Sequence, residues 1–229
     1  MFTNVVVGVG GNESWHDAIA LARQLLSEDG RLTLANIFVL DAEPHLSSGY
    51  SRDVEALERA RAAELLQRAR ARVGIPAAAR WRGAPSVGRG LHELAEALDA
   101  DLLVVGKSRE GVLGRALLGD NTLTALSRAP CPVAVAPAGY AQRAREIQRV
   151  RVFREHSAEQ LASDGGSADL LVVGSHGSGP LGRLLDRRTH RKLARDAESP
   201  LLVLPRPANP LVAAEALAYG ESPVEAGLR

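Results

Sequence analysis

A fifteen-residue segment occurs twice in this chain. DLLVVGKSREGVLGR begins at Asp101, and DLLVVGSHGSGPLGR begins at Asp169. Aligned without gaps, residues 101–137 and 169–205 are identical at about fifteen of 37 positions, far above chance for unrelated segments. Each copy starts with a short apolar run, continues into a glycine-rich loop, and ends with a second apolar run after a proline. The chain therefore contains two versions of one structural unit.

The first 140 residues alternate short β-branched runs with longer amphipathic segments, which predicts βαβ units. Five strands are expected, and the first is apolar throughout, as in a parallel sheet that helices cover on both faces. Ser14 is expected to cap the first helix. The predicted strands are 4–9, 32–40, 79–82, 101–106 and 132–137, and the predicted helices begin at Ser14 or span 53–73, 91–98 and 123–128. The expected fold is α/β, a doubly wound parallel five-stranded sheet, followed by a truncated repeat.

The repeat is incomplete. Residues 149–162 resemble the third strand and the helix after it, and no copies of the first strand, first helix or second strand are found. We therefore expect a complete domain over 1–140, a linker over 141–148 and a partial second domain over 149–205. The proline-containing residues 206–229 are expected to form a flexible tail with one short helix near 212–219.

Composition excludes several classes of protein. A net charge of +1 gives no reason to expect a nucleic acid partner, and no apolar run reaches the roughly 18 residues of a membrane span. A single cysteine, Cys131, predicts a buried thiol in a cytoplasmic protein, and no signal peptide is expected. The six histidines show no metal-ligand spacing, and no catalytic triad order stands out. We therefore expect a protein that is not an enzyme.

The motifs PCPVAVAP and GSHGSGPLGR resemble those of the universal stress protein family. The resemblance implies an adenine-nucleotide alpha-hydrolase-like sheet, with adenosine near the end of the first strand and phosphates on the loop after the fourth. It also implies self-association as a homodimer through the last strands, and the sequence identifies no other protein partner. The family's loop reads Gly, two residues, Gly, nine residues, Gly, then Ser or Thr.

Neither half matches that loop fully. In the first half Gly106 and Gly119 fit, but Arg109 replaces the second glycine and Asp120 replaces the hydroxyl residue. Gly10 stands where the family has a nucleotide-contacting aspartate. The candidate nucleotide-binding residues of this half are Gly8, Val9, Gly10, Gly106, Lys107, Arg109, Gly119, Asp120 and Asn121.

In the second half, Gly174 and Gly177 fit the loop, but the nine-residue spacing ends on Arg187 and Arg188 instead of Gly and Ser. Two hypotheses stay open. The chain is a weak or degenerate ATP binder that uses Mg²⁺ and acts in stress response, or it is an interaction and oligomerisation module in which both halves have lost nucleotide binding. A glycine-rich loop also serves as a plain strand-to-helix turn.

Overall fold

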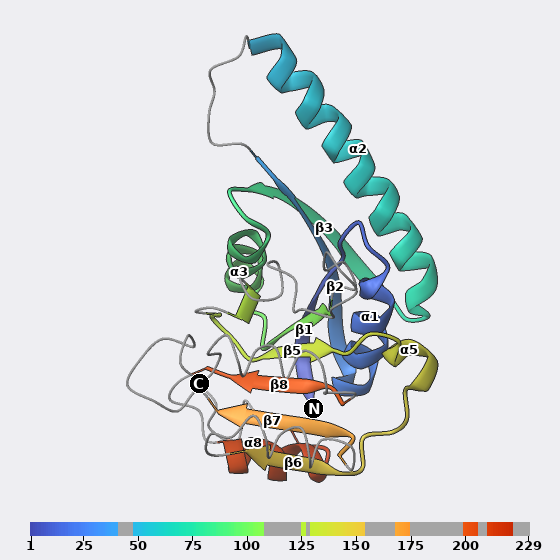
Figure 1. Cartoon of the computed structure of the whole chain (residues 1–229), viewed down its shortest axis with the longest axis vertical. Helices are drawn as coiled ribbons and strands as arrows, with labels where there is room; N and C mark the ends of the chain where they lie inside the picture. Colours follow the sequence, from blue (N-terminus) through green and yellow to red (C-terminus); the bar gives the residue numbers. More distant parts are fainter. Residues whose placement is uncertain are drawn as a thin grey trace, which may run out of the picture.

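The computed structural model describes residues 1–40, 48–107, 125–126, 129–153, 168–174, 199–205 and 210–221. Its strands form one eight-stranded sheet in the order β3-β2-β1-β4-β5-β8-β7-β6 (Figure 1). The two copies of the repeat therefore contribute strands to a single sheet.

Among the described helices, none combines the length and the apolar composition that crossing a bilayer requires.

The first half forms the parallel sheet that the sequence predicted, with strand order β3-β2-β1-β4-β5. The third strand, which was predicted over four residues only, is longer in the structure. The elements are β1 (Phe2–Gly8), α1 (Ser14–Leu25), β2 (Leu26–Val39), α2 (Ser48–Val73), β3 (Ala77–Ala84), α3 (Val87–Ala97), β4 (Leu102–Gly106) and β5 (Val133–Ala136). The α/β fold class is thus confirmed.

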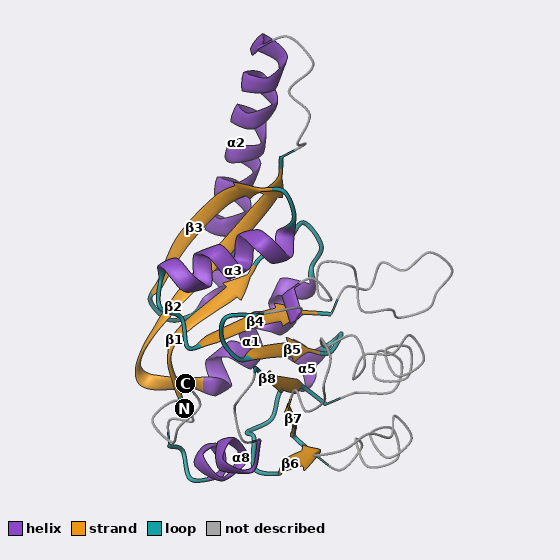
Figure 2. Cartoon of the chain, turned by 90° about the vertical axis from the view of Figure 1, so that its left-hand side faces the viewer, coloured by secondary structure: helices purple, strands orange, loops and turns teal. Residues whose placement is uncertain are grey.

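Helices cover both faces of this sheet (Figure 2). In β4, Leu102 and Val104 join the core on the side of α1 and α2, whereas Leu103 and Val105 join the core on the side of α3. This alternation explains why the strands are apolar at every position. One end of α2 extends beyond the sheet (Figure 1).

The second half continues the sheet through an antiparallel junction. Its strands are β6 (Val150–Phe153), β7 (Leu170–Gly174) and β8 (Leu201–Leu204), which are parallel to one another. β8 pairs antiparallel with β5, with Ala134 opposite Leu202. The pairing of last strands that the family resemblance implied between two chains is therefore found here within one chain.

The strand β6 corrects one sequence-based prediction. It was expected to be a copy of the third strand, but it occupies the place of the first. Val150 pairs with Leu170 as Val5 pairs with Leu102, and Leu170 and Leu102 are equivalent positions of the repeat. β7 is apolar on both faces and needs a hydrogen-bonded neighbour on its free edge, which β6 supplies.

A repeated aspartate fixes this arrangement. In the first half, the carboxylate of Asp101 accepts hydrogen bonds from the backbone N–H groups of Thr3 (2.7 Å) and Asn4 (2.9 Å). In the second half, Asp169 accepts from the N–H groups of Arg149 (2.9 Å) and Gln148 (3.3 Å). The aspartate at the start of each copy therefore holds the beginning of the neighbouring strand.

The short helix expected near 212–219 is found in the tail, but it packs on the sheet instead of belonging to a flexible segment. The helix α8 (Pro210–Ala218) lies against β6 and β7 and buries Ala213, Ala214 and Ala216. The ammonium group of Met1 donates a hydrogen bond to the carbonyl of Glu221, next to that helix. α8 joins the same core as α1 and takes its role in the second half. Small alanine side chains let it lie close to the sheet without an obvious helical periodicity in the sequence.

The predicted linker contains a short helix, α5 (Tyr140–Arg143), that packs on α1. Asp17 of α1 is buried, and its carboxylate accepts hydrogen bonds from the backbone N–H groups of Gly139 and Ala141, both at 2.8 Å. Gly139 has a φ of 76°, which favours glycine. The connection between the halves is thus attached to the first helix.

A chain ending at residue 140 is expected to fold and then to dimerise. It retains β1 to β5 with their helices, but it loses β8 and leaves the edge of β5 unpaired. An exposed apolar edge is a template for pairing with a second chain. Light scattering should give a dimer for this fragment at tens of micromolar, and its thermal unfolding should be cooperative. A strictly monomeric fragment, or a non-cooperative transition, would contradict the prediction.

Candidate functional site

The carboxyl ends of β1 and β4 lie side by side in the first half. The chain continues from β1 through α1 to β2, which lies beside β1. The strand β5 lies beside β4, in the opposite direction across the sheet. In open α/β sheets, ligands bind at such a switch in strand order, outside the carboxyl ends of the strands. The candidate residues Gly8, Val9, Gly10, Gly106 and Lys107 all lie at this position.

The end of β1 is held in place by β2. The backbone N–H of Val9 donates to the carbonyl of Ala35 at 2.8 Å, and the buried amide of Asn36 donates to the carbonyl of Val9 at 2.7 Å. Gly10 and Gly11 follow directly, and a Cβ atom on Gly11 would have no atom within 4 Å. An ordered strand end is thus followed by two glycines that leave open space.

Gly106 lies against the beginning of α1. A Cβ atom there would be 2.0 Å from the carbonyl oxygen of Ser14 and 2.6 Å from its carbonyl carbon. Such distances do not occur in proteins, so only glycine allows the strand and the helix to approach this closely. The first turn of α1 therefore lies beside the last residue of β4.

Ser14 was expected to cap α1 but is instead its first residue. The N-cap is Glu13, whose side chain makes no capping hydrogen bond, and the hydroxyl of Ser14 donates to the side-chain oxygen of Asn12 at 2.6 Å. The close contact with Gly106 places Ser14 inside the helix, where its hydroxyl turns to the preceding loop. Backbone N–H groups at a helix start attract anions.

Lys107 is buried, with 7% of its surface exposed, and its backbone N–H donates to the carbonyl of Ala136 at 2.9 Å. A lysine is almost never buried without a partner for its ammonium group. Its position one residue after Gly106 places a positive charge at the switch point. A phosphate group bound at this position would be stabilised by the charge of this lysine.

Several predicted residues lie outside the described part of the chain: Arg109, Gly119, Asp120, Asn121 and Gly177. Gly174 is described and ends β7, as Gly106 ends β4. The register brings Phe153 opposite Val173, where the repeat would require a counterpart of Gly8. The second half therefore lacks the glycine that ends β1 in the first half.

Asn36 and Asp17 were not among the residues predicted from the sequence. Asn36 interrupts an apolar strand, and Asp17 interrupts the buried face of α1, beside Trp15 and Ala18. A single polar residue at a core position is a signal, because a buried polar group requires a defined partner. The sequence does not show which backbone groups those partners are.

Cys131 is buried, as predicted. Burial raises the pKa of its thiol to about 12, and the negative charge of Asp101 acts in the same direction. The thiol is therefore protonated and unreactive near neutral pH. Within the described ranges, no group of three histidine, cysteine or acidic residues is arranged to hold a metal ion.

Comparison with known proteins identifies the family. The model of the universal stress protein family matches residues 1–137 and again residues 141–205. The comparison with curated proteins gives no match.

The solved structures similar to this chain include the following three. A universal stress protein from Archaeoglobus fulgidus is 13% identical, with 89% of this chain and 98% of that one covered and a TM-score of 0.60. A second, described as a hypothetical protein whose biochemical function was assigned from its structure, is 14% identical, with coverages of 60% and 96% and a TM-score of 0.50. A universal stress protein in complex with cAMP is 26% identical, with coverages of 59% and 97% and a TM-score of 0.43.

The first of these structures extends over both halves of the chain and shows the same fold. The two family matches together cover most of the sequence, and they meet close to the helix α5. This chain belongs to the universal stress protein family, as one full copy of the family domain followed by a partial second copy.

Proposed function

We propose that this chain is a non-enzymatic, cytoplasmic stress protein that binds ATP weakly, with Mg²⁺, at the switch point of its first half. The adenosine would lie near the end of β1, and the phosphates would lie beside Gly106 and Lys107. The observation that carries the proposal is the close approach of Gly106 to Ser14, which brings the N–H groups of the first turn of α1 to the end of β4.

Two further features support it. Gly10 and Gly11 leave open space directly after β1, where a ligand needs close access to the backbone. The buried Lys107 supplies a positive charge beside the same strand ends. The second half has Phe153 in place of Gly8, so the proposal assigns the nucleotide to the first half alone.

The alternative function is an interaction module that binds no nucleotide. The observation in its favour is the filled hydrogen bonding at the end of β1, where the Asn36 amide already occupies the carbonyl of Val9. The family's aspartate is also replaced by Gly10. In this alternative, the close contact at Gly106 only fixes the turn between strand and helix.

The proposal predicts that ATP with Mg²⁺ raises the melting temperature of the full chain. A ligand that binds only the folded state, at a concentration ten times its dissociation constant, raises the free energy of unfolding by about 1.4 kcal/mol. For a chain of this size, the melting temperature then rises by about 3–6 °C. Differential scanning calorimetry with ATP and Mg²⁺, ATP and EDTA, and GTP with Mg²⁺ measures the effect and its specificity. No shift at millimolar ATP would favour the interaction module, and steady release of phosphate from ATP would contradict the non-enzymatic function.

A further inference from the structure

A cavity of about 520 Å³ lies where the two halves of the chain meet. It is located between the segment that follows β5 and the beginnings of β6, β7 and β8, so residues from both copies line it. Its polar lining residues include Tyr140, Arg143, Arg145, Arg149, Asp169 and Ser199. The antiparallel pairing of β5 with β8 creates this site, because it brings the end of β5 next to the beginning of β8.

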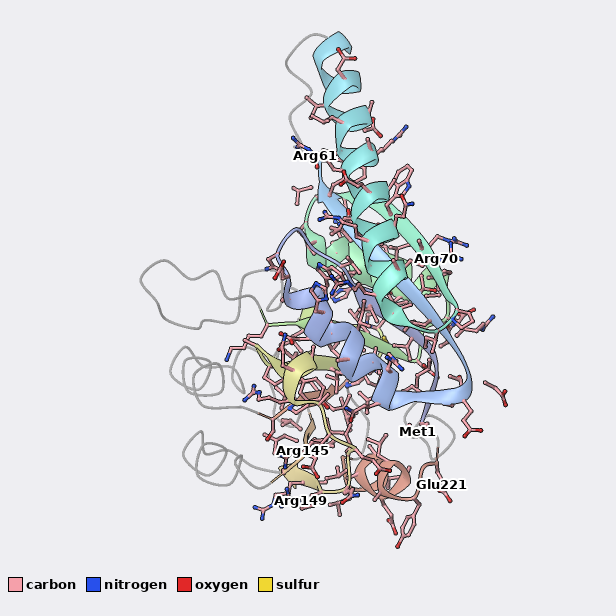
Figure 3. The ribbon with its side chains drawn as sticks, turned by 90° about the vertical axis from the view of Figure 1, so that its right-hand side faces the viewer. Met1, Arg61, Arg70, Arg145, Arg149 and Glu221 are labelled. Atoms are coloured by element: carbon pink, nitrogen blue, oxygen red, sulfur yellow. The ribbon has the colours of Figure 1, made fainter. Side chains whose placement is uncertain are left out.

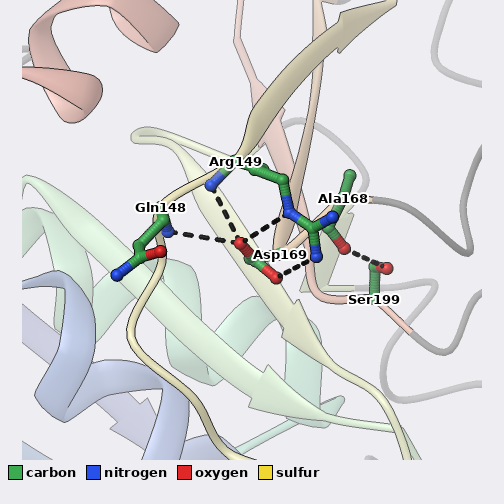
Figure 4. Close-up of polar contacts among 5 residues, drawn as sticks. All are labelled: Gln148, Arg149, Ala168, Asp169 and Ser199. Atoms are coloured by element: carbon green, nitrogen blue, oxygen red, sulfur yellow. Dashed lines mark hydrogen bonds and ion pairs between the residues drawn. The ribbon is translucent and has the colours of Figure 1, made fainter.

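The cavity is positively charged. Three arginines line it against one carboxylate, and that carboxylate is already paired. Arg149 Nη2 lies 3.3 Å from Asp169 Oδ1, and two backbone N–H groups donate to Oδ2 (Figure 4). Partial burial alone would raise the pKa of Asp169, but the hydrogen bonds from Arg149 and Gln148 outweigh it and lower that pKa. Asp169 is thus ionised near pH 7, and its negative charge is paired with the positive charge of Arg149.

Two of the arginines retain capacity for a ligand. Arg145 makes no hydrogen bond or ion pair with any described residue, and Arg149 uses Nε and Nη2 for Asp169 but not Nη1. Both lie on the same side of the molecule, near α5 and β6, far from Arg61 and Arg70 on α2 (Figure 3). Guanidinium groups match the geometry of phosphate oxygens better than ammonium groups do.

The hydroxyl of Tyr140 has no hydrogen-bond partner in the described structure, although only 6% of this residue is exposed. The carboxamide oxygen of Gln24 is also buried without a partner, and the Gln24 side chain lowers the pKa of Tyr140 by less than burial and Asp169 raise it. Burial and the charge of Asp169 raise the pKa of Tyr140 to about 12, so the group is a neutral donor near pH 7. A buried donor without an acceptor costs free energy, so a bound group that supplies an acceptor oxygen would be stabilised there.

The first half offers no equivalent. At the position of Arg149 it has Asn4, and at the position of Ser199 it has Cys131. The Ser199 hydroxyl is buried and donates to the carbonyl of Ala168 at 2.6 Å. The polar and charged lining is therefore specific to the second half and to its junction with the first.

We infer that this junction cavity binds the phosphate group of a small phosphorylated molecule, with Arg145 and Arg149 contacting its oxygens and the Tyr140 hydroxyl donating to it. The volume is within the range of small-molecule sites. The site is separate from the proposed nucleotide site at β1 and β4, because β5 lies between β4 and β8. It therefore goes beyond the proposed function and does not depend on it.

The test uses the full chain and inorganic phosphate as the probe, in buffers of matched ionic strength. Amide chemical shifts should change for Gly139, Ala141, Arg149 and Asp169 as phosphate is added. Arg145→Gln should weaken this binding by about tenfold or more, because it removes a charged hydrogen bond. Arg70→Gln is the matched control, since it removes the same charge from an exposed position on α2 and should leave phosphate binding unchanged.

Tyr140→Phe separates binding from stability. It should weaken phosphate binding but leave the melting temperature without phosphate unchanged or higher, because the buried hydroxyl has no partner to lose. Tyr219→Phe, at a residue that is 75% exposed, should change neither. Shift changes confined to residues near Gly106 and Lys107, equal affinity in Arg145→Gln and Arg70→Gln, or no binding at millimolar phosphate would each overturn the inference.

Discussion

Gly106→Ala is expected to lower the free energy of unfolding by about 3 kcal/mol or more, the upper range for forcing extra atoms into a packed region. The added methyl group would lie 2.0 Å from the carbonyl oxygen of Ser14. Because that neighbour is backbone and not the end of a flexible side chain, α1 as a whole must move away from β4. For a chain of this size the melting temperature should fall by about 6–12 °C, which scanning calorimetry measures.

Gly11→Ala is the matched control, because the same methyl group would meet nothing within 4 Å there. Its melting temperature should remain within about 1–2 °C of the wild type, as for surface substitutions in general. If the nucleotide site is at this switch point, Gly106→Ala should also abolish the stabilisation by ATP, since the first turn of α1 no longer reaches the end of β4. Equal stability of the two variants would contradict the close contact.

Much of the fold could be predicted from the sequence because parallel strands buried on both faces are continuous apolar runs. The strands β1, β4, β5, β7 and β8 are all of this kind, and the long helix α2 follows from its amphipathic pattern. Strand length was underestimated at β3, because the residues missed at its ends are alanines and a glycine without that signature, Ala77, Ala78, Gly83 and Ala84. Such a strand resembles a loop until its neighbour is known.

The arrangement of the second half could not be predicted in the same way. Similarity to the third strand suggested one position for β6, but hydrogen-bond demand at the edge of β7 determined another. The antiparallel junction of β5 with β8 is likewise a choice between partners, which a sequence pattern does not record. The helix α8 itself was predicted, but its packing on β6 and β7 was not, because the small side chains of its alanines give little periodic signal.

For the candidate site, the sequence identified Gly8, Gly10, Gly106 and Lys107, and the structure brings these residues to one end of adjacent strands. It did not show why residue 106 must be glycine. The reason is the close approach of the backbone of α1, and it does not involve a ligand. The sequence also did not identify the junction cavity, because no linear motif contains residues from α5, β6 and β8 together. Sites formed between repeats depend on how the repeats join.

Asp120→Ser is expected to strengthen ATP binding by up to about a thousandfold, the largest change that we predict. Asp120 stands where the family's phosphate loop has serine or threonine, and it lies outside the described residues. A carboxylate about 4 Å from a phosphate charge costs about 4 kcal/mol at an effective dielectric constant near 20. That energy corresponds to roughly three powers of ten in affinity.

The same repulsion explains why we propose a requirement for Mg²⁺. An ion held between the carboxylate and the phosphates would replace repulsion by attraction on both sides. Removing Mg²⁺ should therefore abolish ATP binding by the wild type but only reduce it in Asp120→Ser. Titration calorimetry on both proteins, with Mg²⁺ and with EDTA, measures all four affinities.

Asp53→Ser supplies the control for net charge, because Asp53 is exposed on α2. If Asp53→Ser strengthens ATP binding as much as Asp120→Ser does, the effect is one of overall charge, and Asp120 is not beside the phosphates. If Asp120→Ser binds no better than the wild type while the wild type does bind, the phosphates are not on this loop. If neither protein binds at millimolar ATP, the repulsion at Asp120 is not what prevents binding. The replacement of the family's aspartate by Gly10 would then be the more important change, and the interaction module would be the better account of the chain.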